Sequence, residues 1–311
     1  MTPRTLHDQE ISGLFAALGD QQDFVYLDTS MVDGANNRSL LFSEPVERLC
    51  LQAGEDRAAF LDQAAQWLDR GYYIAGWLGY ELLHDELAIG LKNDATALAD
   101  LGVYGAPNYF DHRSGENDFP SMTDSGRADA TYRLANLRPT IEEEQYCSAI
   151  ERILEYIAAG DTYQVNYTFK LHFDFDGSAA SFYRDLRRSQ PVPYGCFMKH
   201  GDSHILSFSP ELFFRLDSGK IIARPMKGTM KRGRFNGEDK IIARTLNKDI
   251  KNRSENVMIV DLLRNDLSHL VDNTGGGRVE VESLFNVERY RTVFQMTSTI
   301  VATRFSSDRI P

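Results

Sequence analysis

The sequence predicts an α+β fold, in which helices interrupt long runs of strands. Short segments rich in β-branched and aromatic residues follow one another between residues 162 and 225, with turn-forming residues between them. Two longer segments, near residues 140–160 and 238–270, have helical character. Because these helices interrupt runs of strands, antiparallel sheets are favoured over regular βαβ units. The length of 311 residues indicates one large two-lobed domain or two small ones.

The first 120 residues are expected to form a smaller N-terminal subdomain. Residues 22–50 are interpreted as strands that end in the turn segment LLFSEP (40–45), and a helix is expected from Ala58 to Arg70. Residues 111–131 are polar and rich in Gly, Ser, Asp and Pro, which is typical of an exposed linker. We therefore place the boundary between an N-terminal subdomain, 1–120, and a main catalytic domain, 121–311.

The main region begins with a helix whose two ends are marked in the sequence. Thr140 and Glu143 have the spacing of a capping box, and Gly160 stands where a helix C-cap is expected. One face of this helix carries an apolar stripe: Tyr146, Ile150, Ile153 and Ile157. Strands are then expected at 162–173, 194–200, 204–209, 211–216 and 220–225, a helical region from Glu238 to Leu270, and another strand from residue 277.

Composition restricts the class of protein. A formal net charge of -11 argues against nucleic acid or an anionic membrane as the partner. The N-terminal residues lack the apolar stretch of a signal peptide, and no run is long enough to span a membrane, so we expect a cytoplasmic protein. The three scattered cysteines are expected to be reduced and mostly buried, and the histidines have no zinc-site spacing.

A cluster of basic residues between 219 and 234 is unusual in an acidic chain. It contains no acidic residue and comprises Lys220, Arg224, Lys227, Lys231, Arg232 and Arg234. Such a cluster focuses its field on an anionic substrate, but a solvated basic loop facing an acidic patch is the more common explanation on composition alone. Within it, Gly228 beside Lys227 permits close approach of the backbone to a ligand. A lysine among other cations, or one partly desolvated, is a usable amine nucleophile.

The segment 252–266 is helix-like and carries a carboxylate one turn before an apolar stretch. At that position Glu255 is suited to hold Mg²⁺ together with a carboxylate of a substrate. Exposed glutamates are common on helices, so the segment alone favours a surface residue.

Five segments, in order and spacing, resemble blocks of the chorismate-utilising enzymes. They are GDTYQVNY (160–167), SFSPELFF (207–214), RPMKGT (224–229), NRSENVMIVDLLRNDL (252–267) and TVFQMTSTI (292–300). That family includes component I of anthranilate synthase and of aminodeoxychorismate synthase, isochorismate synthase and salicylate synthase. LLFSEP and GWLGYE (76–81) also resemble its first subdomain. The resemblance implies a β-sandwich-like core of antiparallel sheets flanked by helices, as in anthranilate synthase component I.

Two positions distinguish the members of the family. Isochorismate and salicylate synthases place a lysine where this chain has Gln164, and that lysine activates water. An amide takes up no proton near neutral pH, so addition of water is disfavoured here. Anthranilate synthases carry alanine where this chain has Lys227, whereas a lysine in the PxKGT block is typical of aminodeoxychorismate synthases. The resemblance therefore favours amination of chorismate with retention of the pyruvyl group.

The resemblance also implies roles for individual residues. Lys227 would attack ring C2 of chorismate, and Glu211 would protonate the departing C4 hydroxyl. Glu255 would help to hold Mg²⁺ at the ring carboxylate. Substrate contacts are implied for Gln164, Gly228, Thr229 and Gln295. Ammonia would come from a glutamine amidotransferase partner subunit, component II.

Alternatives remain open for several of these residues. Glu211 has the alternative of a strand-edge carboxylate, and Gln164 that of satisfying backbone groups in a buried strand. Gln295 stands where many relatives carry histidine, so a proton-transfer role is not implied.

The end of the sequence departs most from the family. Relatives continue past the TVFQMTSTI block with a GAPK-type segment, further substrate contacts and a second glutamate cluster, none of which precedes Pro311. We therefore expect the chain to be truncated within the catalytic domain. Two alternatives to the leading function remain: an anthranilate synthase component I, and a non-catalytic truncated chorismate-binding remnant.

Overall fold

A computed structural model describes residues 4–19, 21–83, 97–120, 131–273 and 277–303. The chain divides into two compact units, residues 1–124 with 183–311 and residues 125–182. In sequence, α4 (Ala179–Ser189) spans the boundary between them. The predicted linker 111–131 includes the end of a strand at Asp111, and its second part, 121–130, lies outside the described residues.

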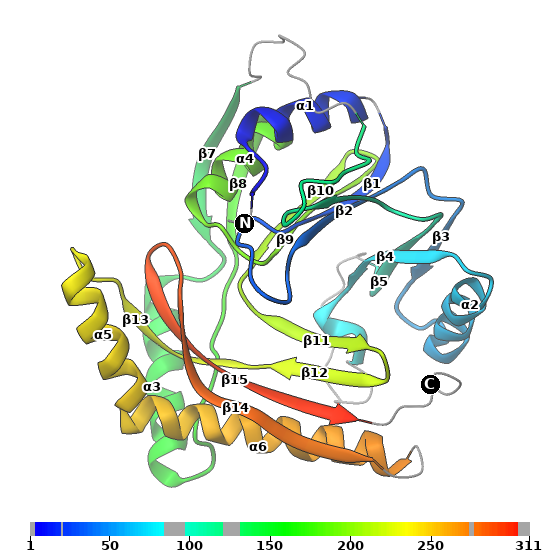
Figure 1. Cartoon of the computed structure of the whole chain (residues 1–311). Helices are drawn as coiled ribbons and strands as arrows, with labels where there is room; N and C mark the ends of the chain where they lie inside the picture. Colours follow the sequence, from blue (N-terminus) through cyan, green and yellow to red (C-terminus); the bar gives the residue numbers. More distant parts are fainter. Residues whose placement is uncertain (1–3, 20, 84–96, 121–130, 274–276, 304–311) are drawn as a thin grey trace. The chain divides into compact units, whose positions relative to one another are not determined.

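The unit of residues 125–182 contains a pair of antiparallel strands and, between them in sequence, one helix (Figure 1). Its elements are β7 (Tyr132–Pro139), α3 (Glu143–Ala159) and β8 (Leu171–Gly177). The expected strand at 162–173 is wrong for most of its length, because β8 begins only at Leu171. Leu171 pairs with Pro139, the last residue of β7, so the preceding residues have no partner strand in the described part of the chain.

The N-terminus of α3 differs in detail from the expected capping box. Glu142, not Thr140, is the N-cap, and its N–H donates a 3.1 Å hydrogen bond to the side chain of Gln145. Thr140 is engaged elsewhere: its hydroxyl accepts a 3.1 Å hydrogen bond from the Lys170 N–H. Gly160 has φ of 84° and ends the helix in the left-handed conformation, as predicted.

The larger unit begins with two antiparallel sheets. The five-stranded sheet has the order β10-β9-β1-β2-β6 and the three-stranded sheet the order β3-β5-β4. Their elements and flanking helices are α1 (Asp8–Leu18), β1 (Asp23–Asp28), β2 (Arg38–Ser43), β3 (Glu47–Leu51), α2 (Arg57–Asp69), β4 (Tyr73–Leu78), the short 3-10 helix η1 (Tyr80–Leu83), β5 (Ala99–Tyr104), β6 (Asn108–Asp111), β9 (Tyr194–His200) and β10 (Ser203–Ser209).

Apolar side chains from the two sheets pack together in a sandwich-like core. Val25, Phe42 and Cys196 from the five-stranded sheet contact Ala75 and Tyr104 from the three-stranded sheet. Alternate residues of β1 point to the other face, where the Tyr26 ring lies against rings from α1 and α4. Antiparallel sheets therefore share a core here, as the sequence resemblance implies.

A third sheet carries most of the predicted site residues. It has the order β11-β12-β15-β13, with β14 also paired to β15. Its strands are β11 (Leu212–Asp217), β12 (Lys220–Arg224), β13 (Met226–Lys231), β14 (Arg278–Arg289) and β15 (Val293–Thr303). The turn between β11 and β12 has positive φ at both Ser218 and Gly219, which is the backbone of a tight two-residue hairpin.

Two helices follow β13, α5 (Asn236–Lys248) and α6 (Ile250–Asn273), where the sequence analysis expected one helical region. Asp249 separates them: its backbone is extended, and its carboxylate accepts the Asn252 N–H at 2.9 Å, which caps α6. Along α6, a buried stripe contacts β12 and β15 (Figure 1). This stripe includes Val260, Leu267 and Val271.

The α+β class and the antiparallel sheets are confirmed. Cys196 is buried, but Cys50 and Cys147 are exposed, so the expectation of mostly buried thiols is wrong for those two. In the described part of the chain, no helix is both long and apolar enough to cross a membrane.

Candidate active site

The segment that contains Lys227 forms a bulge in β13. Met226 pairs with Thr297 of β15, and Thr229 pairs with Gln295, so β13 has one residue more than its partner between these pairs. Bulges of this kind redirect side chains and are frequent beside active sites. Lys227 is half-buried within this irregular backbone.

Glycine is required at position 228 by both conformation and space. Its φ is +104°, a region that other residues rarely adopt. A Cβ added there would lie 3.1 Å from the side chain of Asn252 on α6 and 3.2 Å from Cβ of Met296 on β15. The backbone beside Lys227 is therefore packed closely between a helix and a strand.

Glu211 lies next to the Lys227 segment. Its carboxylate Oε1 accepts a 2.9 Å hydrogen bond from the Met226 N–H, one residue before the lysine. The turn that carries it is closed by a 3.2 Å hydrogen bond from the Glu211 N–H to the Ser209 hydroxyl. The side chain is exposed, so it is accessible to a ligand.

Thr229 and Gln295 contact each other across β13 and β15. The Thr229 hydroxyl donates a 2.6 Å hydrogen bond to Oε1 of Gln295. This bond fixes the carbonyl end of the glutamine side chain and turns its NH₂ group away from the threonine. The fold thus brings four of the predicted residues, Glu211, Gly228, Thr229 and Gln295, to the backbone around Lys227.

The basic cluster is partly neutralised by carboxylates that are distant in sequence. Arg224 lies 3.6 Å from Glu288 and 3.8 Å from Asp33. Arg232 forms an ion pair with buried Asp239. Hydrogen bonds from Arg232 are the main cause that lowers the pKa of Asp239. Within the described residues, the Lys227 amine has no ion-pair partner within 4.0 Å. The cluster therefore supplies less uncompensated positive charge than its sequence suggests.

Glu255 lies on α6, one residue before the fully buried Asn256. Its carboxylate is 3.9 Å from the Lys251 amine, in a pair whose side chains are 33% and 84% exposed. Among the described residues, no group of three or more His, Cys, Asp or Glu side chains lies close enough together to hold a metal. Mg²⁺ commonly takes only one or two protein carboxylates, with waters and substrate completing the shell. Glu255 could therefore be a single protein ligand of Mg²⁺, with water and substrate as the other ligands.

Gln164 belongs to the unit of residues 125–182. It is half-buried, and its backbone carbonyl accepts a 3.2 Å hydrogen bond from the Thr162 hydroxyl. Its part in a site with Lys227 stays a prediction, because Lys227 belongs to the other unit.

Comparison with known proteins identifies the family. Residues 30–307 match the model of the chorismate binding enzymes. The chain belongs to the chorismate binding enzyme family. This membership confirms the resemblance on which the predicted residues were chosen.

Related proteins in this family carry two different names. The chain is 39% identical over 171 residues to an aminodeoxychorismate synthase of Streptomyces griseus, an alignment that covers 55% of this chain and 23% of that protein. It is 36% identical over 166 residues to anthranilate synthase component 1 of Aquifex aeolicus, covering 53% and 33%. With aminodeoxychorismate synthase component 1 of Klebsiella aerogenes it shares 31% identity over 242 residues, covering 73% and 53%.

The aligned region spans between about a quarter and about half of these relatives' own lengths. A solved structure gives the same fold: anthranilate synthase component I of Streptococcus pneumoniae TIGR4 has a TM-score of 0.74 at 22% identity, with 89% of this chain and 71% of that chain covered. Family membership and fold are thus established, and the sequence relatives do not separate the two reactions.

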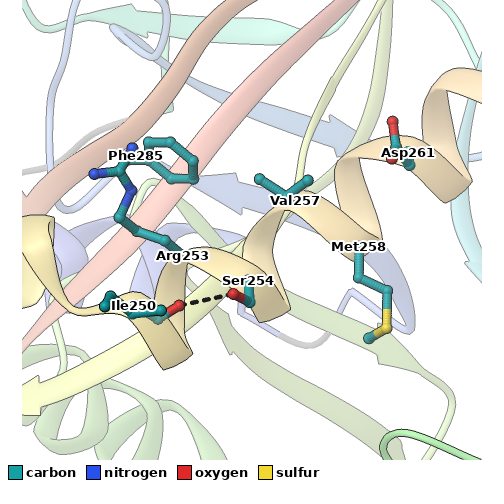
Figure 2. Close-up of a pocket in the computed structure, with 7 residues that line it drawn as sticks. All are labelled: Ile250, Arg253, Ser254, Val257, Met258, Asp261 and Phe285. Carbon is teal, nitrogen blue, oxygen red and sulfur yellow. Dashed lines mark hydrogen bonds between the residues drawn. The ribbon is translucent and has the colours of Figure 1, made fainter.

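A shallow groove on α6 of this chorismate binding enzyme family member contains none of the predicted site residues. It is lined by Ile250, Arg253, Ser254, Val257, Met258, Asp261 and Phe285. Figure 2 shows the Arg253 side chain beside the Phe285 ring, and the guanidinium carbon is 4.3 Å from the ring centroid. Asp261 is paired with Arg264 at 3.2 Å. None of the residues that line the groove belongs to the Lys227 bulge.

Sequence reasoning missed a polar cluster that supports the site from β14. Glu288 accepts hydrogen bonds of 2.9 Å from both Tyr290 and Thr297. The same Tyr290 hydroxyl lies 3.3 Å from the carbonyl oxygen of Pro210, beside Glu211. Burial, followed by the charge of Glu288, raises the pKa of Tyr290 well above its usual range. The one sequence signal for this cluster is the alternation of polar and apolar residues in 278–289, which places the polar side chains on one face of a strand.

Proposed function

We propose that the protein is component I of an aminodeoxychorismate synthase and aminates chorismate through a covalent intermediate on Lys227. The observation that carries the proposal is the lysine itself: it is half-buried at a bulge, without a carboxylate partner among the described residues. An amine that no carboxylate holds in place is free to turn toward a bound substrate and act as a nucleophile. The aminodeoxychorismate synthase relatives agree with this reading.

In the proposed reaction, neutral Lys227 forms a bond from Nζ to ring C2 of chorismate. The ring double bonds shift, and the bond from C4 to its hydroxyl breaks. Glu211 donates a proton so that the hydroxyl leaves as water. Ammonia then forms a bond to C4, the double bonds shift back, and the bond from C2 to Lys227 breaks, so that the lysine leaves as an amine. The surplus proton on the new C4 amine returns to Glu211. The product, 4-amino-4-deoxychorismate, keeps the pyruvyl group.

Other residues of the chain bind and orient the substrate. Gln295, fixed by Thr229, offers its NH₂ group to a substrate oxygen. Gly228 allows a ligand to approach the backbone. Mg²⁺, held in part by Glu255, would offset the negative charge of the ring carboxylate when bound. Ammonia is expected from a glutamine amidotransferase subunit.

Anthranilate synthase component I is the second candidate, supported by the Aquifex aeolicus relative. The two reactions differ in their products, because anthranilate formation releases pyruvate. A product assay therefore decides between them without knowledge of the intermediate.

The experiment uses protein expressed from its complete reading frame, incubated with chorismate, Mg²⁺ and ammonium at mildly alkaline pH. Products are separated by liquid chromatography and identified by mass. The Lys227→Ala variant is compared with Lys231→Ala, which removes an exposed lysine from the same strand. Aminodeoxychorismate from the parent and Lys231→Ala, but not from Lys227→Ala, supports the proposal. Anthranilate with pyruvate overturns it in favour of the second candidate, and no conversion by the parent overturns both.

A further inference from the structure

A buried amide on α6 lies against the backbone of the bulge. Asn256 is fully buried, in helical register with the apolar residues Val260, Leu267 and Val271 that face the sheet. Burial of an amide costs free energy that burial of an apolar side chain does not, unless the amide is hydrogen-bonded. The polar side chain therefore calls for a specific explanation.

The contacts of Asn256 connect the helix to two strands. Its Oδ1 accepts a 2.5 Å hydrogen bond from the hydroxyl of buried Ser298 on β15. Its Nδ2 donates a long hydrogen bond, 3.5 Å, to the backbone carbonyl of Lys227 on β13. Because the hydroxyl fixes the oxygen end of the amide, the nitrogen end is directed to the bulge. The side chain thus acts as a bridge with a defined orientation.

The same bulge is held at its other residues. The Ser298 N–H donates a 3.3 Å hydrogen bond to the carbonyl of Pro225. Gly228 packs against Asn252, one helical turn before Asn256. The Ser298 hydroxyl also accepts the Phe285 N–H at 3.2 Å, which keeps the hydroxyl hydrogen free for Asn256. Pro225, Lys227 and Gly228 are therefore each contacted by α6 or β15.

We propose that Asn256 is a positioning residue, which holds the backbone of Lys227 in the bulged conformation and thereby sets the position of the lysine amine. The inference deepens the proposed function and rests on the role of Lys227 as nucleophile. Asn256 itself is buried and acts through the lysine backbone. A bulge is an irregularity that ladder hydrogen bonds do not maintain, so a separate contact is needed to keep it in one conformation.

Three variants separate this role from a general contribution to packing. Asn256→Asp keeps the shape but places an acceptor against the Lys227 carbonyl. Ser298→Ala leaves the amide in place and removes the hydroxyl that orients it. The control is Asn108→Asp on β6, where Nδ2 donates a 3.0 Å hydrogen bond to the carbonyl of Asp118. The control loses the same kind of contact at a carbonyl outside the bulge.

The first readout is the reactivity of Lys227, which needs no substrate. Each protein is acetylated with a trace of acetic anhydride between pH 7 and 10, and labelling of Lys227 relative to Lys231 is measured by peptide mass spectrometry. We expect Asn256→Asp and Ser298→Ala to change this ratio by about 2- to 10-fold, the range that one hydrogen bond of ordinary strength gives. The control should leave the ratio unchanged.

The second readout is steady-state amination of chorismate. A misplaced nucleophile lowers kcat by about 10- to 100-fold while KM for chorismate changes little. An unchanged labelling ratio in both variants, with cooperative unfolding retained, would overturn the positioning role. If Asn256→Asp does not fold, Ser298→Ala decides. A changed ratio in a protein whose parent does not aminate chorismate supports the positioning role while the proposed function fails.

Discussion

The hydroxyl of Thr229 and the side-chain carbonyl of Gln295 are joined by a 2.6 Å hydrogen bond across β13 and β15. Gln295 is one of the predicted substrate residues, and its NH₂ group can donate to a substrate oxygen only if the amide keeps its orientation. The threonine therefore fixes which end of the amide faces a ligand.

Thr229→Val removes this bond and keeps the shape of the side chain. We expect KM for chorismate to rise by about fivefold with little change in kcat, because a hydrogen bond of about 1 kcal/mol that orients a binding group is lost. Thr299→Val, on β15, is the control and should leave KM unchanged. Steady-state kinetics at saturating ammonium measure the effect. A loss of kcat at constant KM would contradict the binding role of Gln295.

Replacing Gly228 by alanine should damage the bulge itself. The added Cβ meets Asn252 at 3.1 Å and Met296 at 3.2 Å, in a backbone with φ of +104°. Gly160→Ala is the matched control, because φ is +84° and no atom lies within 4 Å of the added Cβ. Strain from a positive φ costs about 1–2 kcal/mol in both variants. Denaturant unfolding should show a larger loss for Gly228→Ala, and equal losses would contradict the close packing around Gly228.

Local signals in the sequence predicted much of the fold. The turn between β11 and β12 and the end of α3 both follow from glycines, Gly219 and Gly160, which tolerate positive φ. Capping was less predictable: Thr140 has the right chemistry for an N-cap, but a hydrogen bond from Lys170 engages its hydroxyl. A local pattern does not reveal competition from a residue that is distant in sequence.

The candidate site shows the same limit. The family resemblance located the residues around Lys227, but not the carboxylates that neutralise the basic cluster. Arg224 pairs with Asp33 from the N-terminal region and with Glu288 from β14.

The order of strands in a sheet is also hard to predict. Any strand offers the same backbone groups to a neighbour, so sequence alone does not say that β9 joins β1. The sequence contains one sign of the role of Asn256: it is a polar residue on the buried stripe of an amphipathic helix.

The buried ion pair between Asp28 and Arg187 should be important for stability. The Arg187 Nε donates a 2.6 Å hydrogen bond to Asp28, and the two side chains are 1% and 7% exposed. The Tyr183 hydroxyl also donates to this carboxylate, at 3.1 Å. Arg187→Met leaves a buried carboxylate without its cation, which costs about 3–5 kcal/mol.

Arg188→Met, at the next position of the same helix, is the control. Arg188 pairs with Asp8 through side chains that are 59% and 36% exposed, and a pair of this kind contributes about 1 kcal/mol or less. Urea unfolding at neutral pH measures both variants. Similar losses of unfolding free energy would show that burial of the Asp28 pair does not set its contribution.

Asp111 should make the stability of the protein depend on acid pH. Hydrogen bonds from the N–H groups of Ser114 and Arg113, at 3.0 and 2.9 Å, are the main cause that lowers its pKa from 3.8 to about 2. A carboxyl whose pKa is lower in the folded protein stabilises it above the unfolded pKa, near 3.8. That contribution is lost as pH falls toward 2. Asp111→Asn should therefore be less stable than the parent above pH 4, and the difference should shrink on acidification. Unfolding free energies from urea titrations at several pH values between about 5 and 2.5 test this, and a difference that stays constant over that range would exclude Asp111 as the titrating group.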